Sequence, residues 1–142
     1  MANEGIKGAR NRMSKEQRDK PLLLIADDDP ELMGILIKRL QQSEDYEFIT
    51  ASDGERALEM IRDEKPDAVI LDVMMPRKNG WEVLKEIRKD DSVKEMGVLM
   101  LTGIGSSLNE MTSPLYGADA YLDKPFDFAE LVFKIKRILA SK

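Results

Sequence analysis

The sequence predicts an α/β domain in which a five-stranded parallel sheet carries helices on both faces. Three short apolar runs, at residues 22–26, 68–71 and 98–101, are unbroken by polar residues. Runs of this length are typical of strands buried on both faces, as in a parallel sheet. Weaker strand patterns cover residues 48–51 and 120–122, with helical patterns between the strands. Because crossovers between parallel strands are right-handed, this alternation predicts a doubly wound (βα)5 domain.

The first predicted helix directly follows the first strand. Asp29 is a suitable N-cap, and Pro30 suits the first helical position, where its missing N–H would have no partner in any case. The face expected to pack on the sheet carries four apolar residues at helical spacing, Leu32, Ile35, Leu36 and Leu40.

Local sequence patterns also predict the starts of three other helices. Ser52, with Glu55 three residues later, indicates a capping box at the second helix. The third helix is expected to follow Asn79-Gly80, and the last to begin near Asp127. Residues 103–117 differ, because they are rich in glycine and serine and include Pro114. Since proline inside a helix costs about 3 kcal/mol or more, we predict a short or broken fourth helix there.

The composition indicates one domain and limits its setting. The chain has 142 residues, of which 42% are apolar. Residues 1–20 are basic and are expected to form a mobile tail before a domain at residues 21–142. No apolar run approaches the roughly 20 residues of a membrane span, and no signal peptide is evident, so we expect a cytoplasmic protein without a membrane span. The net charge of −5 argues against nucleic-acid binding.

The absence of cysteine and histidine restricts the possible chemistry. Disulfides, thiolate nucleophiles and zinc sites built from cysteine are excluded. A metal would have to be bound by oxygen atoms, which favours Mg²⁺, Ca²⁺ or Mn²⁺. If the protein handles phosphohistidine, that residue must belong to another chain.

Polar side chains follow four of the predicted strands. Asp27 and Asp28 follow the first strand, Asp72 the third, Thr102 the fourth and Lys124 the fifth. In open α/β sheets the ligand site lies at the carboxyl ends of the strands, so these groups should converge. Their convergence is a stronger signal than any one residue.

The charges in such a cluster require compensation. Two carboxylates about 4 Å apart repel by about 4 kcal/mol at an effective dielectric constant near 20. A divalent cation and a lysine would offset this repulsion, and Mg²⁺ is the usual cation of phosphate chemistry. A carboxylate beside Mg²⁺ can act as a nucleophile toward phosphorus, while the cation and the lysine stabilise the transferring group.

Four sequence stretches resemble the receiver domain of response regulators, the switch of two-component signalling. They are LLLIADDDP at residues 22–30, VILDVMMPRKNG at 69–80, VLMLTG at 98–103 and GADAYLDKPF at 117–126. Each is moderately specific, but all four in this order are highly specific. The resemblance implies a flavodoxin-like fold for everything except the basic tail.

The resemblance also implies a role for each site residue. Asp72 matches the phosphoacceptor, and Tyr121 matches the switch aromatic. The Lys124-Pro125 bond is a candidate for a cis peptide. Phosphoryl binding is implied for Thr102 and Lys124. Mg²⁺ would be bound by three carboxylates and one backbone carbonyl, those of Asp27, Asp28, Asp72 and Met74.

The expected function is a phosphoaccepting switch rather than an enzyme. A sensor histidine kinase or a histidine phosphotransfer protein would supply the phosphoryl group to Asp72, and a downstream protein effector would respond. The last predicted helix runs almost to Lys142, so we expect output through another protein rather than through an attached effector domain.

Two other functions are possible from the sequence. A phosphatase of the haloacid-dehalogenase type needs the motif Asp-x-Asp-x-Thr/Val, but here the aspartates are followed by Pro30 and Glu31. A receiver-like docking module that is not phosphorylated would lack a pocket residue, and none is missing. Steady turnover of a phosphate ester would favour the first, and the absence of any response to a phosphoryl mimic would favour the second.

Overall fold

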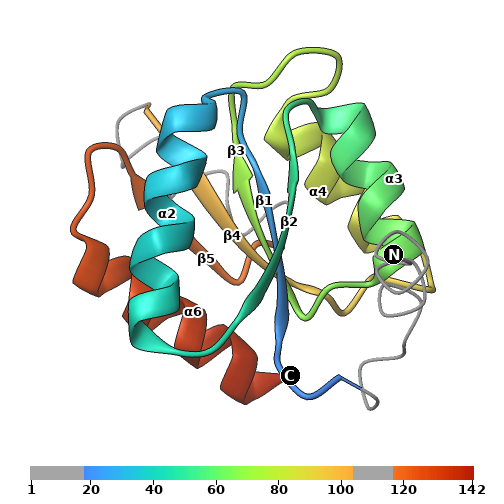
Figure 1. Ribbon diagram of the computed structural model, residues 1–142. Helices are drawn as coiled ribbons and strands as arrows, with labels where there is room; N and C mark the ends of the chain where they lie inside the picture. The colour runs from blue at the N-terminus through green and yellow to red at the C-terminus, as the bar shows by residue number, and fades with distance from the viewer. Residues whose placement is uncertain (1–17, 104–116) are drawn as a thin grey trace, which may run out of the picture.

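The structure, a computed structural model, describes residues 18–103 and 117–142. Five parallel strands form one sheet in the order β2-β1-β3-β4-β5, with helices on both of its faces (Figure 1). The predicted fold class is therefore confirmed. The elements are β1 (Leu22–Ala26), α2 (Pro30–Ser43), β2 (Glu47–Ala51), α3 (Gly54–Glu64), β3 (Ala68–Asp72), α4 (Gly80–Lys89), β4 (Gly97–Thr102), β5 (Ala120–Asp123) and α6 (Phe128–Ser141).

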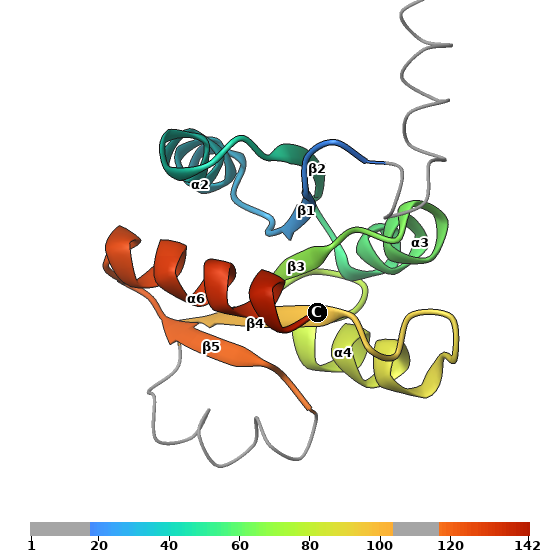
Figure 2. The same ribbon diagram turned by 90° about the horizontal axis from the view of Figure 1, so that it is seen from below.

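Alternate residues of the central strands face opposite sides of the sheet. On β1, Leu24 and Ala26 pack with residues of α3 and α4, whereas Leu23 and Ile25 pack with residues of α2 and α6. Figure 2 shows these two helical layers on either side of the sheet. Every residue of β1, β3 and β4 is buried. This two-sided burial explains why the runs in the sequence are unbroken.

Three helix starts agree with the sequence predictions. Asp29 caps α2, with Pro30 in its first turn, and Asp127 caps α6. At α4 the Asn79 side chain accepts a hydrogen bond from the N–H of Glu82 (2.9 Å), and the Glu82 carboxylate accepts one from the N–H of Asn79 (2.8 Å). This reciprocal capping box satisfies two N–H groups that the helix itself leaves without partners.

The predicted start of α3 is wrong by one residue. The helix begins at Gly54, and its cap is Asp53 rather than Ser52; the Asp53 carboxylate accepts a hydrogen bond from the N–H of Arg56 (2.8 Å). Both Ser52 and Asp53 are good capping residues, so local sequence could not separate them. The close approach of Gly54 to the backbone carbonyl of Lys78 fixes the boundary.

The buried face of α2 differs from the predicted one. Ile35 does not belong to the buried face of α2, because its side chain is 44% exposed, and Met33 packs into the core instead. The buried stripe follows the i, i+3, i+7 spacing of Met33, Leu36 and Leu40. The predicted fourth helix falls largely on residues 104–116, which lie outside the described residues.

Arg18 connects the start of the described chain to the amino-terminal end of the sheet. Its guanidinium pairs with the Asp67 carboxylate (3.1 Å) and donates to the carbonyl oxygens of Glu64 and Lys65. Asp67 also accepts a hydrogen bond from the N–H of Leu22, the first residue of β1 (2.7 Å). The Arg18 side chain is only 7% exposed, so these contacts form a partly buried clasp.

The edge strand β5 is held in register at its start. Asp119, which precedes the strand, accepts hydrogen bonds from the N–H of Val98 (2.8 Å) and from the Arg88 guanidinium (3.0 Å). Arg88 also donates to the carbonyl oxygen of Gly117 (2.9 Å). These contacts place the start of β5 beside the start of β4, and the register then sets Asp123 opposite Thr102. None of the helices in the described ranges is both long and apolar enough to cross a membrane.

Candidate functional site

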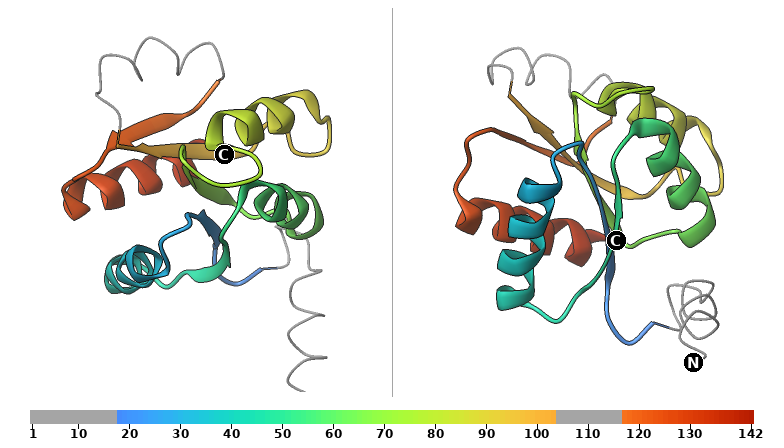
Figure 3. Two further views of the ribbon diagram at one scale, coloured as in Figure 1. Left: turned by 90° about the horizontal axis from the view of Figure 1, so that it is seen from above. Right: turned by 45° about the horizontal axis from the view of Figure 1, so that its top comes forward.

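The residues predicted to carry the chemistry meet at the carboxyl end of the sheet. Asp27 and Asp28 follow β1, Asp72 ends β3, Thr102 ends β4, and Lys124 follows β5. Because β1 and β3 are neighbours in the sheet, their acidic ends lie side by side. The view from above in Figure 3 looks onto this edge of the sheet. The convergence that the sequence predicted is therefore present.

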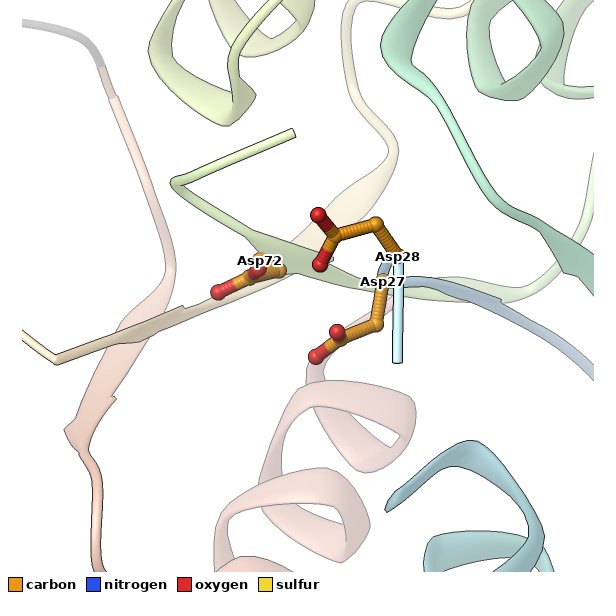
Figure 4. A group of neighbouring side chains, drawn as sticks. All are labelled: Asp27, Asp28 and Asp72. Carbon is orange, nitrogen blue, oxygen red and sulfur yellow. The ribbon is translucent and has the colours of Figure 1, made fainter. Parts of the chain in front are cut away.

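The three carboxylates form a compact acidic cluster. One oxygen atom of each of Asp27, Asp28 and Asp72 lies within 4.8 Å of the corresponding oxygen of the others. Figure 4 shows the three side chains extending from the ends of two adjacent strands toward a common space. Asp27 and Asp72 are buried, whereas Asp28 is exposed. The cluster is thus fixed by the sheet on one side and accessible on the other.

Lys124 supplies the positive charge opposite this cluster. Its Nζ lies 3.1 Å from Asp27 Oδ2 and 3.1 Å from Asp72 Oδ1. The side chain of Lys124 is 28% exposed, while those of Asp27 and Asp72 are 1% and 5% exposed. The second Asp27 oxygen accepts a hydrogen bond from the N–H of Asp29 (2.9 Å). One lysine therefore bridges the two buried carboxylates.

Burial and charge shift the pKa of Asp72. Burial, together with the negative charge of Asp27, raises the pKa of the Asp72 carboxyl to about 6, although Lys124 opposes this change. Asp28 adds a smaller contribution in the same direction as Asp27. The cluster therefore holds more negative charge than one lysine balances, and a cation among the carboxylates would lower this pKa.

The pKa of Lys124 is shifted by competing effects. Burial lowers it, but the charges and hydrogen bonds of Asp72 and Asp27 together raise it above its ordinary value. The lysine therefore stays protonated at neutral pH and can neutralise an anionic group in the pocket.

The donor set fits a hard, oxygen-preferring cation. Three carboxylates within reach of one another match the ligands of Mg²⁺, which is held in proteins through one or two carboxylates together with other oxygens and water. Met74, the predicted carbonyl ligand, lies between buried Val73 and buried Met75, and its own side chain is 63% exposed. Its coordinating role stays a prediction.

Thr102 and Tyr121 occupy the positions expected of them in the fold. Thr102 is fully buried at the end of β4, and its carbonyl accepts a hydrogen bond from the N–H of Lys124 (2.6 Å). Tyr121 lies on β5 opposite Met100 and packs, partly buried, against the core on the α3 and α4 side. Their switch roles stay predictions. The Lys124-Pro125 bond is cis, which confirms that prediction.

Two residues that join the start of α3 to the loop after β3 were not singled out from the sequence. Asp53 and Arg77 form an ion pair (3.2 Å) between the start of α3 and the loop that follows β3. They are 24 positions apart, and nothing in their spacing indicates the contact. Only the capping potential of an aspartate at a helix start could have drawn attention to Asp53.

Comparison with known proteins assigns a family to these features. The model of the response regulator receiver domain matches residues 23–136. The transcriptional regulatory protein CpxR of Escherichia coli is 44% identical over 117 residues, which cover 82% of this chain and 48% of CpxR. The chain thus spans about half the length of the curated relatives that it matches.

Solved structures agree over nearly their whole length. A candidate response regulator from Chloroflexus aurantiacus is 38% identical, with a TM-score of 0.81, and the match covers 86% of this chain and 99% of that one. A CheY-like receiver domain protein from Methanospirillum hungatei is 30% identical, with a TM-score of 0.78, and the match covers 87% of this chain and 96% of that one.

Proposed function

This chain belongs to the response regulator receiver domain family, and on that premise we propose that it is a switch phosphorylated on Asp72 in the presence of Mg²⁺. The observation that carries the proposal is the meeting of three carboxylates and Lys124 at one edge of the sheet. The charge of this cluster suits a site that binds a cation and a phosphoryl group together.

Asp72 is suited to the role of nucleophile. With a pKa of about 6, about nine-tenths of its carboxyl groups are ionised at pH 7 even before a cation binds. An oxygen of the carboxylate would form a bond to the phosphorus atom of a partner's phosphohistidine. The phosphorus–nitrogen bond would break, the imidazole would leave with the electron pair and take up a proton, and Asp72 would become an acyl phosphate.

The surrounding residues would hold the reacting groups in place. Asp27, Asp28, Asp72 and the carbonyl of Met74 would hold Mg²⁺, which when bound neutralises charge on the phosphoryl oxygens. Lys124 would pair with one phosphoryl oxygen in place of its present carboxylate partners. The hydroxyl of Thr102 would bind another, and Tyr121 would follow its movement. In phosphoryl transfer such positioning and neutralisation are the main contributions of a protein.

The proposed partners follow from the absence of histidine in this chain. The donor would be a sensor histidine kinase or a histidine phosphotransfer protein. The acceptor of the signal would be a protein effector that distinguishes the phosphorylated from the unphosphorylated domain. The switch would not turn over substrates as an enzyme does, because its product is the modified domain itself.

The test is intact-mass spectrometry after incubation with acetyl phosphate, with and without MgCl₂. We expect one added phosphoryl group that requires Mg²⁺ and is absent in Asp72→Asn. Asp91→Asn is the control, since Asp91 is an exposed carboxylate that pairs with nearby Lys94. No added group on the wild-type protein would indicate a docking module, and continuous hydrolysis of acetyl phosphate far beyond one equivalent would indicate a phosphatase.

A further inference from the structure

We infer that Asp53 and Arg77 are a positioning pair that fixes the loop carrying the Met74 carbonyl and so sets the affinity of the site for Mg²⁺. The inference rests on the proposed function, because it assumes that the acidic cluster binds this cation. The loop in question, residues 73–79, connects β3 to α4 and is called the acceptor loop below.

The acceptor loop contacts the start of α3. The Asp53 carboxylate serves two elements at once: Oδ1 accepts the N–H of Arg56 in the first turn of α3 (2.8 Å), and Oδ2 accepts Nε of Arg77 (3.2 Å). The side chain of Asp53 is 18% exposed and that of Arg77 is 63% exposed, so the pair lies at the surface with its carboxylate end partly shielded from water. None of the three carboxylates of the acidic cluster comes from β2. The segment between β2 and α3, which contains Asp53, nevertheless contacts the acceptor loop through Arg77.

Backbone contacts bring the two segments closer still. The N–H of Gly54 donates to the carbonyl oxygen of Pro76 (3.3 Å). A Cβ atom on Gly54 would collide with the backbone carbonyl of Lys78, so only glycine permits this approach. The N–H of Gly80, the first residue of α4, donates to the carbonyl of Val73 (2.8 Å), which closes the loop at its base. The loop is therefore held at its base and on its α3 side.

Arg77 occupies a strained backbone position. Its φ of 71° lies in the left-handed region, which a glycine would adopt at far lower cost. A non-glycine residue persists in such a conformation where the surroundings determine it, and strain of this kind concentrates at functional sites. A glycine at this position would lack the guanidinium that pairs with Asp53.

The strain and the ion pair bear directly on the metal site. Met74 lies two residues after Asp72 and three before Arg77, with Val73 and Met75 buried on either side. Its carbonyl direction is therefore set by the end of β3 and by the anchor at Arg77. Releasing that anchor widens the range of carbonyl orientations, which weakens a ligand that must meet the near-octahedral geometry of Mg²⁺.

The experiment is a titration of the full chain with MgCl₂, followed by backbone amide NMR without any phosphodonor. Asp53→Asn keeps the helix cap, because asparagine also caps well, but removes the charge that binds Arg77. Arg77→Gln removes the other partner, and Arg77→Lys keeps the positive charge. We expect the dissociation constant for Mg²⁺ to rise about three- to tenfold in Asp53→Asn and in Arg77→Gln.

Two further features separate positioning from a general structural effect. The double variant should bind Mg²⁺ as weakly as either single variant, because both remove the same contact, and Arg77→Lys should recover most of the affinity. Phosphorylation at saturating MgCl₂ should stay within about twofold of wild type, since Asp72 and Lys124 are untouched. The control is Glu59→Gln, which removes an exposed ion pair with Arg56 (2.8 Å) on the same helix.

The outcomes distinguish this inference from the proposed function. Equal Mg²⁺ affinity in wild type, Asp53→Asn and Arg77→Gln would overturn the positioning pair even if Asp72 is phosphorylated normally. Additive losses in the double variant would also overturn it. A wild-type protein that binds Mg²⁺ but is never phosphorylated would remove the proposed function and leave the pair standing if the variants still bind the cation more weakly.

Discussion

The two sides of the acidic cluster differ in how firmly the fold holds them. On the inner side, Asp72 and Thr102 end central strands, Asp27 directly follows one, and all three are buried. On the outer side, Asp28 is exposed, and Lys124 follows the edge strand with 28% of its side chain exposed. The inner side fixes the negative charge where water cannot fully solvate it, and the outer side supplies groups that can move to meet a ligand. Substitutions on the two sides should therefore have different consequences.

Apart from removal of the acceptor Asp72 itself, the largest effect on the phosphorylation rate is expected from the outer side. Lys124→Ala should slow phosphorylation of Asp72 about a hundredfold at saturating MgCl₂, comparable to the loss of one preorganised donor to a developing negative charge. The rate is measured by intact mass over time with acetyl phosphate. Lys134→Ala is a matched control, because Lys134 is equally exposed at 29% and pairs with Glu130 on α6. A rate within threefold of wild type for Lys124→Ala would show that the lysine does not face the transferring group.

Besides removing the phosphoacceptor, substitution of Asp72 on the inner side should also change the stability of the fold. Asp72→Asn should stabilise the protein at pH 7.5 without Mg²⁺ by about 1–3 kcal/mol, because a pKa displaced by about two units corresponds to roughly that free energy. The folded protein holds the Asp72 proton up to a pKa of about 6, above the ordinary value of 3.8. The folded state thus binds more protons than the unfolded chain between these values, and stability falls as the pH rises through this window.

Urea unfolding at pH 7.5 and at pH 4 checks this prediction. The gain in Asp72→Asn should be largest at the higher pH and should shrink toward zero at the lower, where the wild-type carboxyl is protonated in the folded state. A variant less stable than wild type at pH 7.5 would mean that the ion pair with Lys124 outweighs the burial of the charge.

A smaller effect separates metal binding from folding. Asp28→Asn should weaken Mg²⁺ binding about tenfold, or about 1.4 kcal/mol, while changing the free energy of unfolding by less than about 0.5 kcal/mol because the side chain is exposed. Amide NMR titration and urea unfolding give the two quantities. Asp29→Asn is the control, since asparagine preserves the cap of α2. Equal losses of affinity in both variants would remove Asp28 from the predicted ligands.

The smallest effect is expected at the edge strand. Tyr121→Phe should leave the phosphorylation rate within about twofold of wild type, or about 0.4 kcal/mol in activation free energy, because the role proposed for this side chain follows the transfer. Intact mass over time with acetyl phosphate measures it. A larger loss would give the tyrosine hydroxyl a part in the transfer itself and not only in the response to it.

Sequence reasoning located the inner side of the site well. Unbroken apolar runs identified β1, β3 and β4, and the residue after each run is a site residue because parallel strands end at one edge of the sheet. Asp29 was identified as a helix cap from local sequence, and Asp127 as the approximate start of the last helix. The Asn79-Gly80 pair only marked the point after which α4 was expected. These features depend on neighbours in the sequence or on a short period, and a single sequence records both.

Contacts between distant loops were not predictable in the same way. The start of α3 at Gly54 depends on the carbonyl of Lys78, and the pair of Asp53 with Arg77 depends on the path of the acceptor loop. The exposure of Ile35 depends on which stripe of α2 meets the sheet. In each case tertiary packing chose between local alternatives of similar free energy.

The contacts of Arg18 with residues 64–67 hold the start of the described chain at the amino-terminal end of the sheet, which makes this end suitable for attaching a dye or a surface. Asp19 is exposed beside it, at the amino end of β1, and the chain contains no cysteine. Asp19→Cys would therefore introduce a unique thiol about one strand length from the acidic cluster, or about 17 Å for five residues. A sensor chip or fluorophore coupled there would leave the pocket open to a phosphodonor in solution.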